Sequence, residues 1–281
     1  MKNFIHLQPR AWGFVNQISR IFFLVLCGVV LGFSPLYAHG SAESAHGSSS
    51  PPGKGIDLLQ LGATVYKHMC VYCHGDDGDG GGKAMAYLYP WPRDFRQGVF
   101  KYRTTPFGSI PLDKDIYRTI SRGVPGTAMP AWGGALSEDE TWGVVEYIKK
   151  FSKRFEREKP RKAITVGSVP PSTPESVENG KKVYQEMRCA RCHGTDLQGD
   201  GPIAHELYDI WDHRVFVYEL TDPNTYKFGF DKKDLFVILT TGIDGTPMKS
   251  YNHLTDEERW NLVSYIESKI RKEKFQPAQY E

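Results

Sequence analysis

The sequence of 281 residues predicts an all-α, loop-rich protein made of two similar domains in tandem. The string Cys-x-x-Cys-His occurs twice, beginning at Cys70 and at Cys189, 119 residues apart. From Asp115 and Asp234 the copies align without a gap, as DIYRTISRGVPGTAM and DLFVILTTGIDGTPM. Apolar residues recur at helical spacing, and 28 Gly and 18 Pro indicate long loops. A period this long indicates two domains rather than a solenoid.

The N-terminal segment, residues 1–38, has the order of a secretory signal peptide. Three basic and no acidic residues accompany an uncharged apolar run at 21–33 and a small residue at Ala38. We expect cleavage after Ala38. An uncut membrane anchor is the alternative, although the uncharged stretch barely reaches the length that spans a bilayer. In both cases we expect an exported, periplasmic chain, free or associated with the membrane, and a flexible tether at 39–55.

Each repeat has the same order of predicted helices, which places the first domain at 56–151 and the second at 175–281. A lead helix ends at the first cysteine, a short helix precedes Gly-Thr-x-Met, and a final helix follows. The final helices begin at capping boxes: Ser137 with Glu140, and Thr255 with Glu258. Residues 152–174 between the domains are rich in basic residues and proline, which predicts an exposed, semi-rigid linker.

The charge of the chain excludes one class of partner. Without residues 1–38 the sequence has 32 Lys+Arg and 33 Asp+Glu, so it is nearly neutral. The second domain is acidic, with 14 basic and 19 acidic residues, whereas the first has 11 of each. Nucleic-acid-binding proteins need a basic face, so we expect no nucleic-acid partner.

The two strings are the attachment signature of a c-type haem. Thiols three positions apart can form thioethers with the two vinyl groups of one haem, and the histidine that follows is then held beneath the iron. The sequence therefore predicts two covalently bound haem c groups. The attachment residues would be Cys70, Cys73, Cys189 and Cys192, and the iron ligands would be His74 and His193.

Met129 and Met248 are the predicted second axial ligands. Each follows the histidine of its own repeat by 55 residues, and each is preceded by Gly-Thr-x. A thioether is a soft, neutral ligand, and His/Met ligation raises the reduction potential of a haem. An iron with both axial positions filled passes single electrons and resists binding oxygen or a substrate.

Other interpretations of these residues are weaker. A single Cys-x-x-Cys is also typical of a disulfide, a thiol-redox pair or half of a zinc site, but the repeated pattern with a matched methionine is not. A methionine more often fills a core than ligates a metal. Four histidines compete as ligands but lack a counterpart in the other repeat: His68, His205, His213 and His253. Four residues have open roles, either at haem propionates or in packing and at the surface: Trp132, Tyr251, Arg93 and Arg96.

The sequence resembles the class I cytochromes c, in tandem, over about 56–151 and 175–274. Gly62 and Tyr66 on the first lead helix resemble the small and aromatic pair of that family, and the strings VVEYI and LVSYI resemble its final helix. The resemblance implies that the first and last helices cross at a glycine. The expected contacts are Gly62 with Tyr147 in the first domain and Gly180 with Tyr265 in the second. The second copy also has the Gly-Pro that follows the histidine loop in the family, at 201–202, whereas the first copy lacks it at 80–81.

The predicted function is single-electron transfer between redox protein partners outside the cytoplasmic membrane. We expect no enzymatic activity and no small-molecule substrate. One alternative is a dihaem electron-transfer subunit of a membrane oxidase or of a molybdenum oxidoreductase complex. A dihaem peroxidase is a further alternative. It needs an open iron, which the matched methionines argue against.

Overall fold

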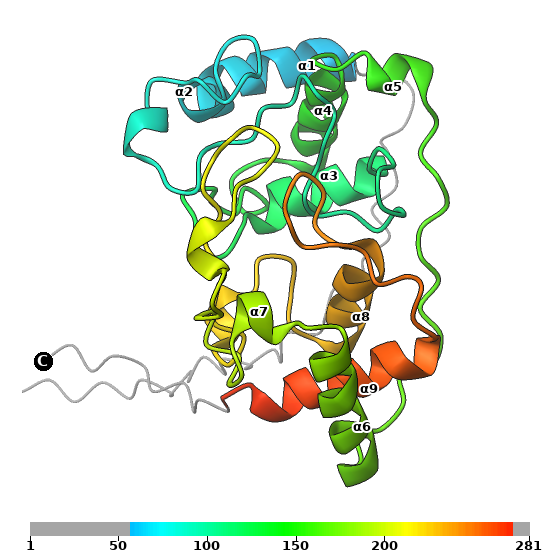
Figure 1. Cartoon of the computed structure of the whole chain (residues 1–281). Helices are drawn as coiled ribbons and strands as arrows, with labels where there is room; N and C mark the ends of the chain where they lie inside the picture. The colour runs from blue at the N-terminus through cyan, green and yellow to red at the C-terminus, as the bar shows by residue number, and fades with distance from the viewer. Residues whose placement is uncertain (1–56, 272–281) are drawn as a thin grey trace, which may run out of the picture. The chain divides into compact units, whose positions relative to one another are not determined.

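The computed structural model describes residues 57–271 (Figure 1). The expected signal peptide and the whole of the expected tether lie outside this range. Both repeats belong to one compact unit of the chain. Within 57–271 the regular elements are helices, and the β-type pairing is an isolated bridge between Tyr208 and Arg214. The predicted all-α, loop-rich fold is confirmed. No helix within this range is long and apolar enough to cross a membrane.

The first repeat contains helices on either side of its Cys-x-x-Cys-His string. Their bounds, in chain order, are α1 Leu58–Val65, the π-helical turn η1 Tyr66–Cys70, α2 Val71–His74, the 3₁₀ turn η2 Met85–Tyr87, α3 Asp113–Arg122 and α4 Glu138–Lys149. The helices α1, α3 and α4 are the predicted lead, short and final helices.

The second repeat has the same plan. Its elements are α6 Pro174–Glu186, α7 Ala190–His193, the 3₁₀ turns η3 Ala204–Glu206 and η4 Pro223–Thr225, α8 Lys232–Thr241 and α9 Asp256–Lys269. Both predicted capping boxes are present, at the starts of α4 and α9. Each serine or threonine hydroxyl accepts the N3 amide, and the N3 glutamate accepts the cap amide, so two otherwise unpaired N–H groups are satisfied.

The lead and final helices cross in each repeat: α1 packs on α4, and α6 packs on α9 (Figure 1). A methyl group at Gly62 would collide with the carbonyl oxygen of Gly143, so glycine is required by the close approach of the backbones. This contact lies one turn earlier on α4 than the expected contact with Tyr147. In the second repeat Gly180 does lie against Tyr265, as expected, and also against the carbonyl of Asn261.

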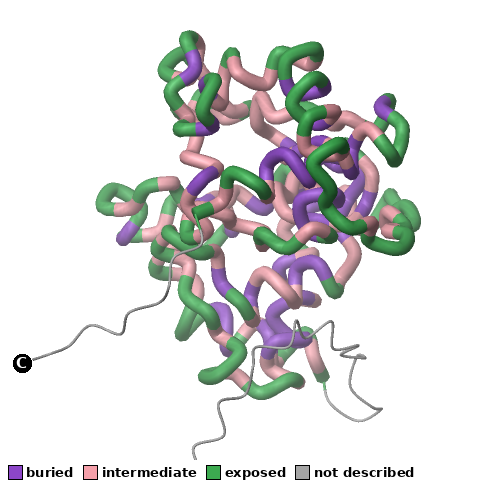
Figure 2. The backbone as a smooth tube through the Cα atoms, turned by 90° about the horizontal axis from the view of Figure 1, so that it is seen from below, coloured by how far each residue is buried: buried purple, intermediate pink, exposed green. Residues whose placement is uncertain are grey.

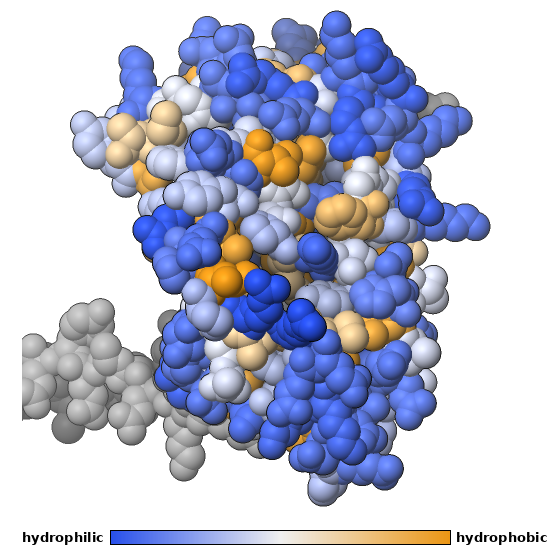
Figure 3. Space-filling model, viewed as in Figure 1, coloured by the Kyte–Doolittle hydropathy of each residue, from blue (hydrophilic) through white to orange (hydrophobic). Residues whose placement is uncertain are grey.

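Each repeat has its own apolar core, which appears as the purple stretches in Figure 2. The predicted apolar faces of α4 and α9 are buried in these cores, with Trp142, Val145 and Ile148 in the first and Trp260, Val263 and Ile266 in the second. The face drawn in Figure 3 is mainly hydrophilic, with a few separate apolar groups. The burial pattern follows the helical periodicity of the sequence.

The segment 152–174 is exposed over most of its length, but it is attached to both repeats. It contains the short helix α5 Arg154–Arg157, and Ser152 at its start is buried. The amide of Ile164 donates to the carbonyl of Thr104 at 2.7 Å. Its side chain packs against the core of the second repeat. The linker therefore follows the protein surface rather than extending freely into solvent.

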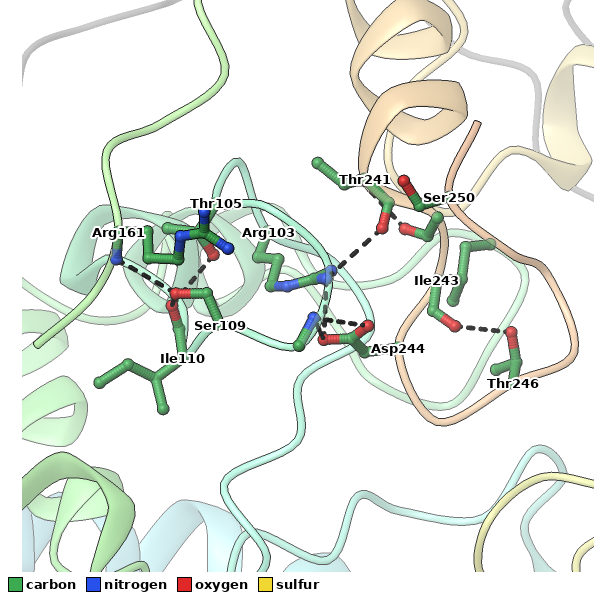
Figure 4. A network of polar contacts seen from close by, with 12 residues as sticks. Arg103, Thr105, Ser109, Ile110, Arg161, Thr241, Ile243, Asp244, Thr246 and Ser250 are labelled. Carbon is green, nitrogen blue, oxygen red and sulfur yellow. Dashed lines mark hydrogen bonds and ion pairs between the residues drawn. The ribbon is translucent and has the colours of Figure 1, made fainter. Parts of the chain in front are cut away.

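Ion pairs connect the two repeats within residues 57–271. Arg103 and Asp244 form the more buried one, at 2.8 Å, with side chains 0% and 6% exposed (Figure 4). The same guanidinium donates to the carbonyl of Thr241 at 3.4 Å, and the amide of Gly108 donates to Asp244 at 3.1 Å. Nε and Nη1 of Arg103 are buried without a hydrogen-bond partner in the described residues, so the ion pair and the Thr241 carbonyl satisfy only part of this guanidinium.

The second ion pair joins Arg118 on α3 to Asp234 on α8, at 2.7 Å. Arg118 also donates to the carbonyl of Phe228 at 2.8 Å and lies over the Phe228 ring, 3.9 Å from its centroid. Asp234 is the repeat counterpart of Asp115. In the first repeat, Asp115 instead accepts hydrogen bonds from Thr104 within its own domain.

Candidate functional site

The first Cys-x-x-Cys-His string lies on a tight sequence of helical turns. Cys70 ends the π-helical turn η1, and α2 carries Cys73 and His74. Residues three apart in a helix share one face, so both thiols are presented together. The helix ends at Gly75, whose φ of 77° reverses the chain. The buried Tyr66 hydroxyl donates to the Gly75 carbonyl at 2.9 Å and fixes this turn.

The second string is built in the same way. Cys189 directly precedes α7, which carries Cys192 and His193. Gly194, with a φ of 78°, ends the helix, and Tyr184 donates to its carbonyl at 2.6 Å. None of the four cysteines in the described range forms a disulfide. Two thiols on one turn, available for bonding, are what thioether attachment of a haem requires.

Both string histidines are suited to ligate a metal. Burial lowers the pKa of His74 to about 4 and that of His193 to about 4, so the imidazoles are neutral near pH 7. His74 Nδ1 lies 3.3 Å from the carbonyl oxygen of Arg93, and its ring stacks on Phe95. A hydrogen bond at Nδ1 leaves Nε2 as the ligating atom.

The two histidines differ in this supporting contact. Nδ1 of His193 is buried and has no hydrogen-bond partner among residues 57–271. The family resemblance suggested the reverse, because the Gly-Pro that normally accompanies the histidine loop is in the second repeat. In the first repeat a backbone carbonyl supplied by Arg93 orients the ring without that proline.

The Gly-Thr-x-Met segments form identical turns. In the first, the Thr127 hydroxyl donates to the carbonyl of Val124 at 2.7 Å and accepts the Met129 amide at 3.1 Å. The amide of Val124 donates back to the Met129 carbonyl at 3.0 Å. Gly126 has a φ of 64°, a conformation that glycine adopts without strain. The turn therefore fixes where the methionine lies.

In the second turn, Thr246 and Met248 make the same contacts. The Thr246 hydroxyl donates to the carbonyl of Ile243 at 2.7 Å and accepts the Met248 amide at 3.2 Å. Gly245 has a φ of 79°. Because the same hydrogen bonds close both turns, they explain why the Gly-Thr-x-Met string occurs in both repeats.

Each repeat has a cavity that brings its string and its methionine together. The first is lined by Cys70, Cys73, His74 and Met129, and by apolar side chains of α3 and α4. The second is lined by Cys189, Cys192, His193 and Met248, and by apolar side chains of α8 and α9. An apolar cavity with two thiols, one neutral imidazole and one thioether fits a covalently attached haem. These eight residues remain the proposed attachment and ligand set.

Of the other residues considered as ligands or propionate partners, some line the two cavities and some do not. None of the four competing histidines lines either cavity. Met69 does line the first cavity beside Met129, but it is 42% exposed and precedes the attachment cysteine. Trp132 lines the first cavity and Tyr251 the second. Arg96 forms a surface ion pair with Asp94.

Two residues that border both cavities were missed by the sequence analysis: Lys101 and Tyr102. They belong to no motif and no matched position of the repeat. One sequence feature points to this region: each repeat has a lysine next to a tyrosine, as Lys101-Tyr102 in the first and Tyr226-Lys227 in the second.

The fold and these two sites define a tandem c-type cytochrome. Residues 57–148 match the family model described as cytochrome c oxidase, cbb3-type, subunit III, and residues 177–269 match the model described as cytochrome c. The chain thus belongs to the cytochrome c family, as a tandem class I cytochrome with two covalently bound haem c groups.

Several proteins that this chain is similar to are components of complexes or of an oxidase. It is similar to a chain of the reducing HAO-like protein complex of Kuenenia stuttgartiensis, with a TM-score of 0.75 and 38% identity, covering 79% of this chain and 100% of that one. It is 31% identical to the cbb3-type cytochrome c oxidase subunit CcoP of Azospirillum sp. (strain B510), over 76% of this chain and 64% of that protein.

A further relative is the cbb3-type cytochrome c oxidase subunit FixP of Sinorhizobium medicae (strain WSM419). It is 28% identical over 54% of this chain and 45% of that protein. The chain thus spans about half to two thirds of the length of the curated relatives it matches, whereas it covers the whole of the Kuenenia chain.

Proposed function

We propose that this chain is the dihaem electron-transfer subunit of a redox complex of the reducing HAO-like kind. One observation carries the proposal: the similarity to a chain of such a complex, at 38% identity over all of that chain. The chain would pass single electrons between that complex and a second redox protein.

The proposed roles of the site residues follow from their chemistry. Cys70 and Cys73 would hold one haem covalently, and Cys189 and Cys192 the other. His74 and Met129 would ligate the first iron and His193 and Met248 the second, which would leave no position for a substrate. When bound, each haem supplies a one-electron Fe(III)/Fe(II) couple. The apolar walls exclude water, so the change in charge occurs in a nonpolar surrounding.

The proposal also places the chain in the periplasm and makes it an electron carrier without enzymatic activity. The signal-like segment at 1–38 supports export to the periplasm. The matched methionines support a carrier rather than an enzyme, because a peroxidase needs an iron with an open position. Carbon monoxide tests this point directly: the reduced protein should bind little of it. If the reduced protein bound about one or two molecules of carbon monoxide per chain, the carrier role would be contradicted.

A second candidate is a subunit of a cbb3-type oxidase. The family model that matches residues 57–148 and the similarity to CcoP favour it. Purification of the native chain from the membrane and soluble fractions, with mass spectrometry of what accompanies it, distinguishes the candidates. Co-purification with an HAO-like protein is expected. Co-purification with oxidase subunits instead would replace the first proposal by the second.

A further inference from the structure

A third cavity, of about 470 Å³, lies between the two haem-site cavities and is lined by residues of both repeats. It shares Arg93, Lys101 and Tyr102 with the first haem-site cavity. It shares Lys101, Tyr102, Tyr218 and Lys227 with the second. Lys101 and Tyr102 therefore border all three spaces. We call this space the central cavity.

The walls of the central cavity contain two cations, Arg93 and Lys101, that form no ion pair with a carboxylate of residues 57–271. Both residues are half-buried. Of the lining acids, Asp94 is paired with Arg96, and Asp209 accepts the backbone amides of Trp211 and His213. Asp79 accepts the amide of Gly81. Asp209 also attracts both cations at longer range, but no carboxylate of residues 57–271 forms an ion pair with either of them.

Neutral hydrogen-bond donors also line the central cavity. Arg93 lies over the Trp211 ring, 4.0 Å from its centroid, and Nε1 of Trp211 is buried without a hydrogen-bond partner in the described chain. Burial raises the pKa of Tyr102, so its hydroxyl stays protonated and can donate. Buried donors are normally paired, and a group of them without acceptors indicates a ligand that supplies acceptors.

Burying the charged side chains of Arg93 and Lys101 without an ion-paired carboxylate costs free energy. Burial lowers the pKa of Lys101 to about 8 and that of Arg93 to about 10. A carboxylate in the central cavity would offset this cost and would satisfy the donors at the same time. A haem has two such carboxylates, its propionates, on one edge. Each haem-site cavity adjoins the central cavity through Lys101 and Tyr102.

We propose that Lys101 and Tyr102 form a carboxylate-binding site shared by the two haems, which receives propionates from both sides. Arg93 serves the first haem only, and Lys227 serves the second only. The charge of Lys101 then disfavours oxidation of both irons, and the two potentials depend on one side chain. This inference rests on the two haems of the proposed function and not on the identity of the partner.

The test is a potentiometric titration of the purified dihaem protein with Lys101→Met, which keeps the length of the side chain and removes its charge. Both midpoints should fall, each by a three- to tenfold change in its reduction equilibrium, where tenfold is about 59 mV for one electron. Lys227→Met should lower the second midpoint more than the first, because Lys227 lines the second haem-site cavity while its Nζ reaches only the Gly126 carbonyl of the first repeat. Lys150→Met, an exposed lysine that lines none of the three cavities, is the matched control and should change neither.

The second midpoint is identified with Met248→His, which changes the absorption of one iron. If Lys101→Met lowers one midpoint only, or neither by more than Lys150→Met does, the shared site is wrong. Tyr102→Phe, which removes a single oxygen, repeats the test should Lys101→Met fail to fold. It should lower both midpoints by a smaller amount, and unchanged midpoints would again refute the site.

A free anion from solution would have the same chemistry as a propionate. Inorganic phosphate added at constant ionic strength distinguishes the two sources. Midpoints that do not respond to phosphate are expected, because the propionates already occupy the donors. A phosphate-dependent shift that Lys101→Met abolishes would overturn the proposal in favour of an anion site. A haem count by alkaline pyridine spectroscopy comes first: fewer than two haems per chain contradicts the proposed function itself, whereas two haems with unchanged midpoints contradict this inference alone.

Discussion

Removing Arg103 should destabilise the protein by about 3 kcal/mol. Its side chain is fully buried, and that of Asp244 is 6% exposed. Arg103→Met fills the space but leaves a buried carboxylate without its counter-ion, and breaking a buried pair in this way costs about 3–5 kcal/mol. The Gly108 amide still donates to Asp244 at 3.1 Å, which places the expectation at the lower end. At about 1.4 kcal/mol per tenfold change, this is roughly a hundredfold shift in the folding equilibrium.

The assay is equilibrium urea unfolding of the haem-loaded protein, followed by tryptophan fluorescence and by haem absorbance. The double variant Arg103→Met/Asp244→Leu should recover most of the loss, because it removes both charges. The control is Arg96→Met at the surface pair with Asp94, where the arginine side chain is 53% exposed and the expected loss is about 0–1 kcal/mol. A loss below about 1 kcal/mol for Arg103→Met, with an unchanged denaturant slope, would refute the buried-pair reasoning.

Two further predictions concern the helix crossing and the axial ligand. Gly62→Ala should lower the free energy of unfolding by about 1–3 kcal/mol in the same urea assay, because the new methyl group meets the backbone of Gly143. The control is Gly134→Ala, where nothing lies within 4 Å of the added methyl group. Equal losses for the two variants would contradict the close crossing of the helices. Met129→Ala should open the first iron, so that the reduced protein binds about one carbon monoxide per chain, measured by absorbance, whereas the unaltered protein binds almost none. An unchanged spectrum and midpoint in Met129→Ala would remove this residue from the ligand set.

The local architecture of each site could be predicted because it depends on neighbouring residues. The capping box of Ser137 and Glu140 links residues three apart, and the turn before Met129 is closed by Thr127, two residues earlier. Such contacts recur wherever the same short string recurs. The match between the repeats therefore predicted both copies of the fold, including the all-helical class and the order of helices.

The contact of Gly62 shows where this reasoning loses precision. The family pattern predicted correctly that a glycine allows the lead and final helices to approach. It placed the contact at Tyr147, whereas the nearest atoms belong to Gly143, one turn away. A sequence pattern identifies the face of a helix, but the depth at which two helices cross depends on the packing of all side chains between them.

The sequence by itself determined which residues are proposed for the two haem sites: four cysteines, two histidines and two methionines in copies of one motif. It also placed these motifs beside helices whose faces follow from periodicity. The tertiary structure decided how the copies meet. Asp115 and Asp234 occupy the same position in the repeat, yet the first bonds within its own domain and the second pairs with Arg118 across the contact. The location of Lys101 between both cavities was decided in the same way. Local motifs depend on residues close in the chain, whereas these contacts join residues more than a hundred positions apart and exist only once both domains have folded and packed together.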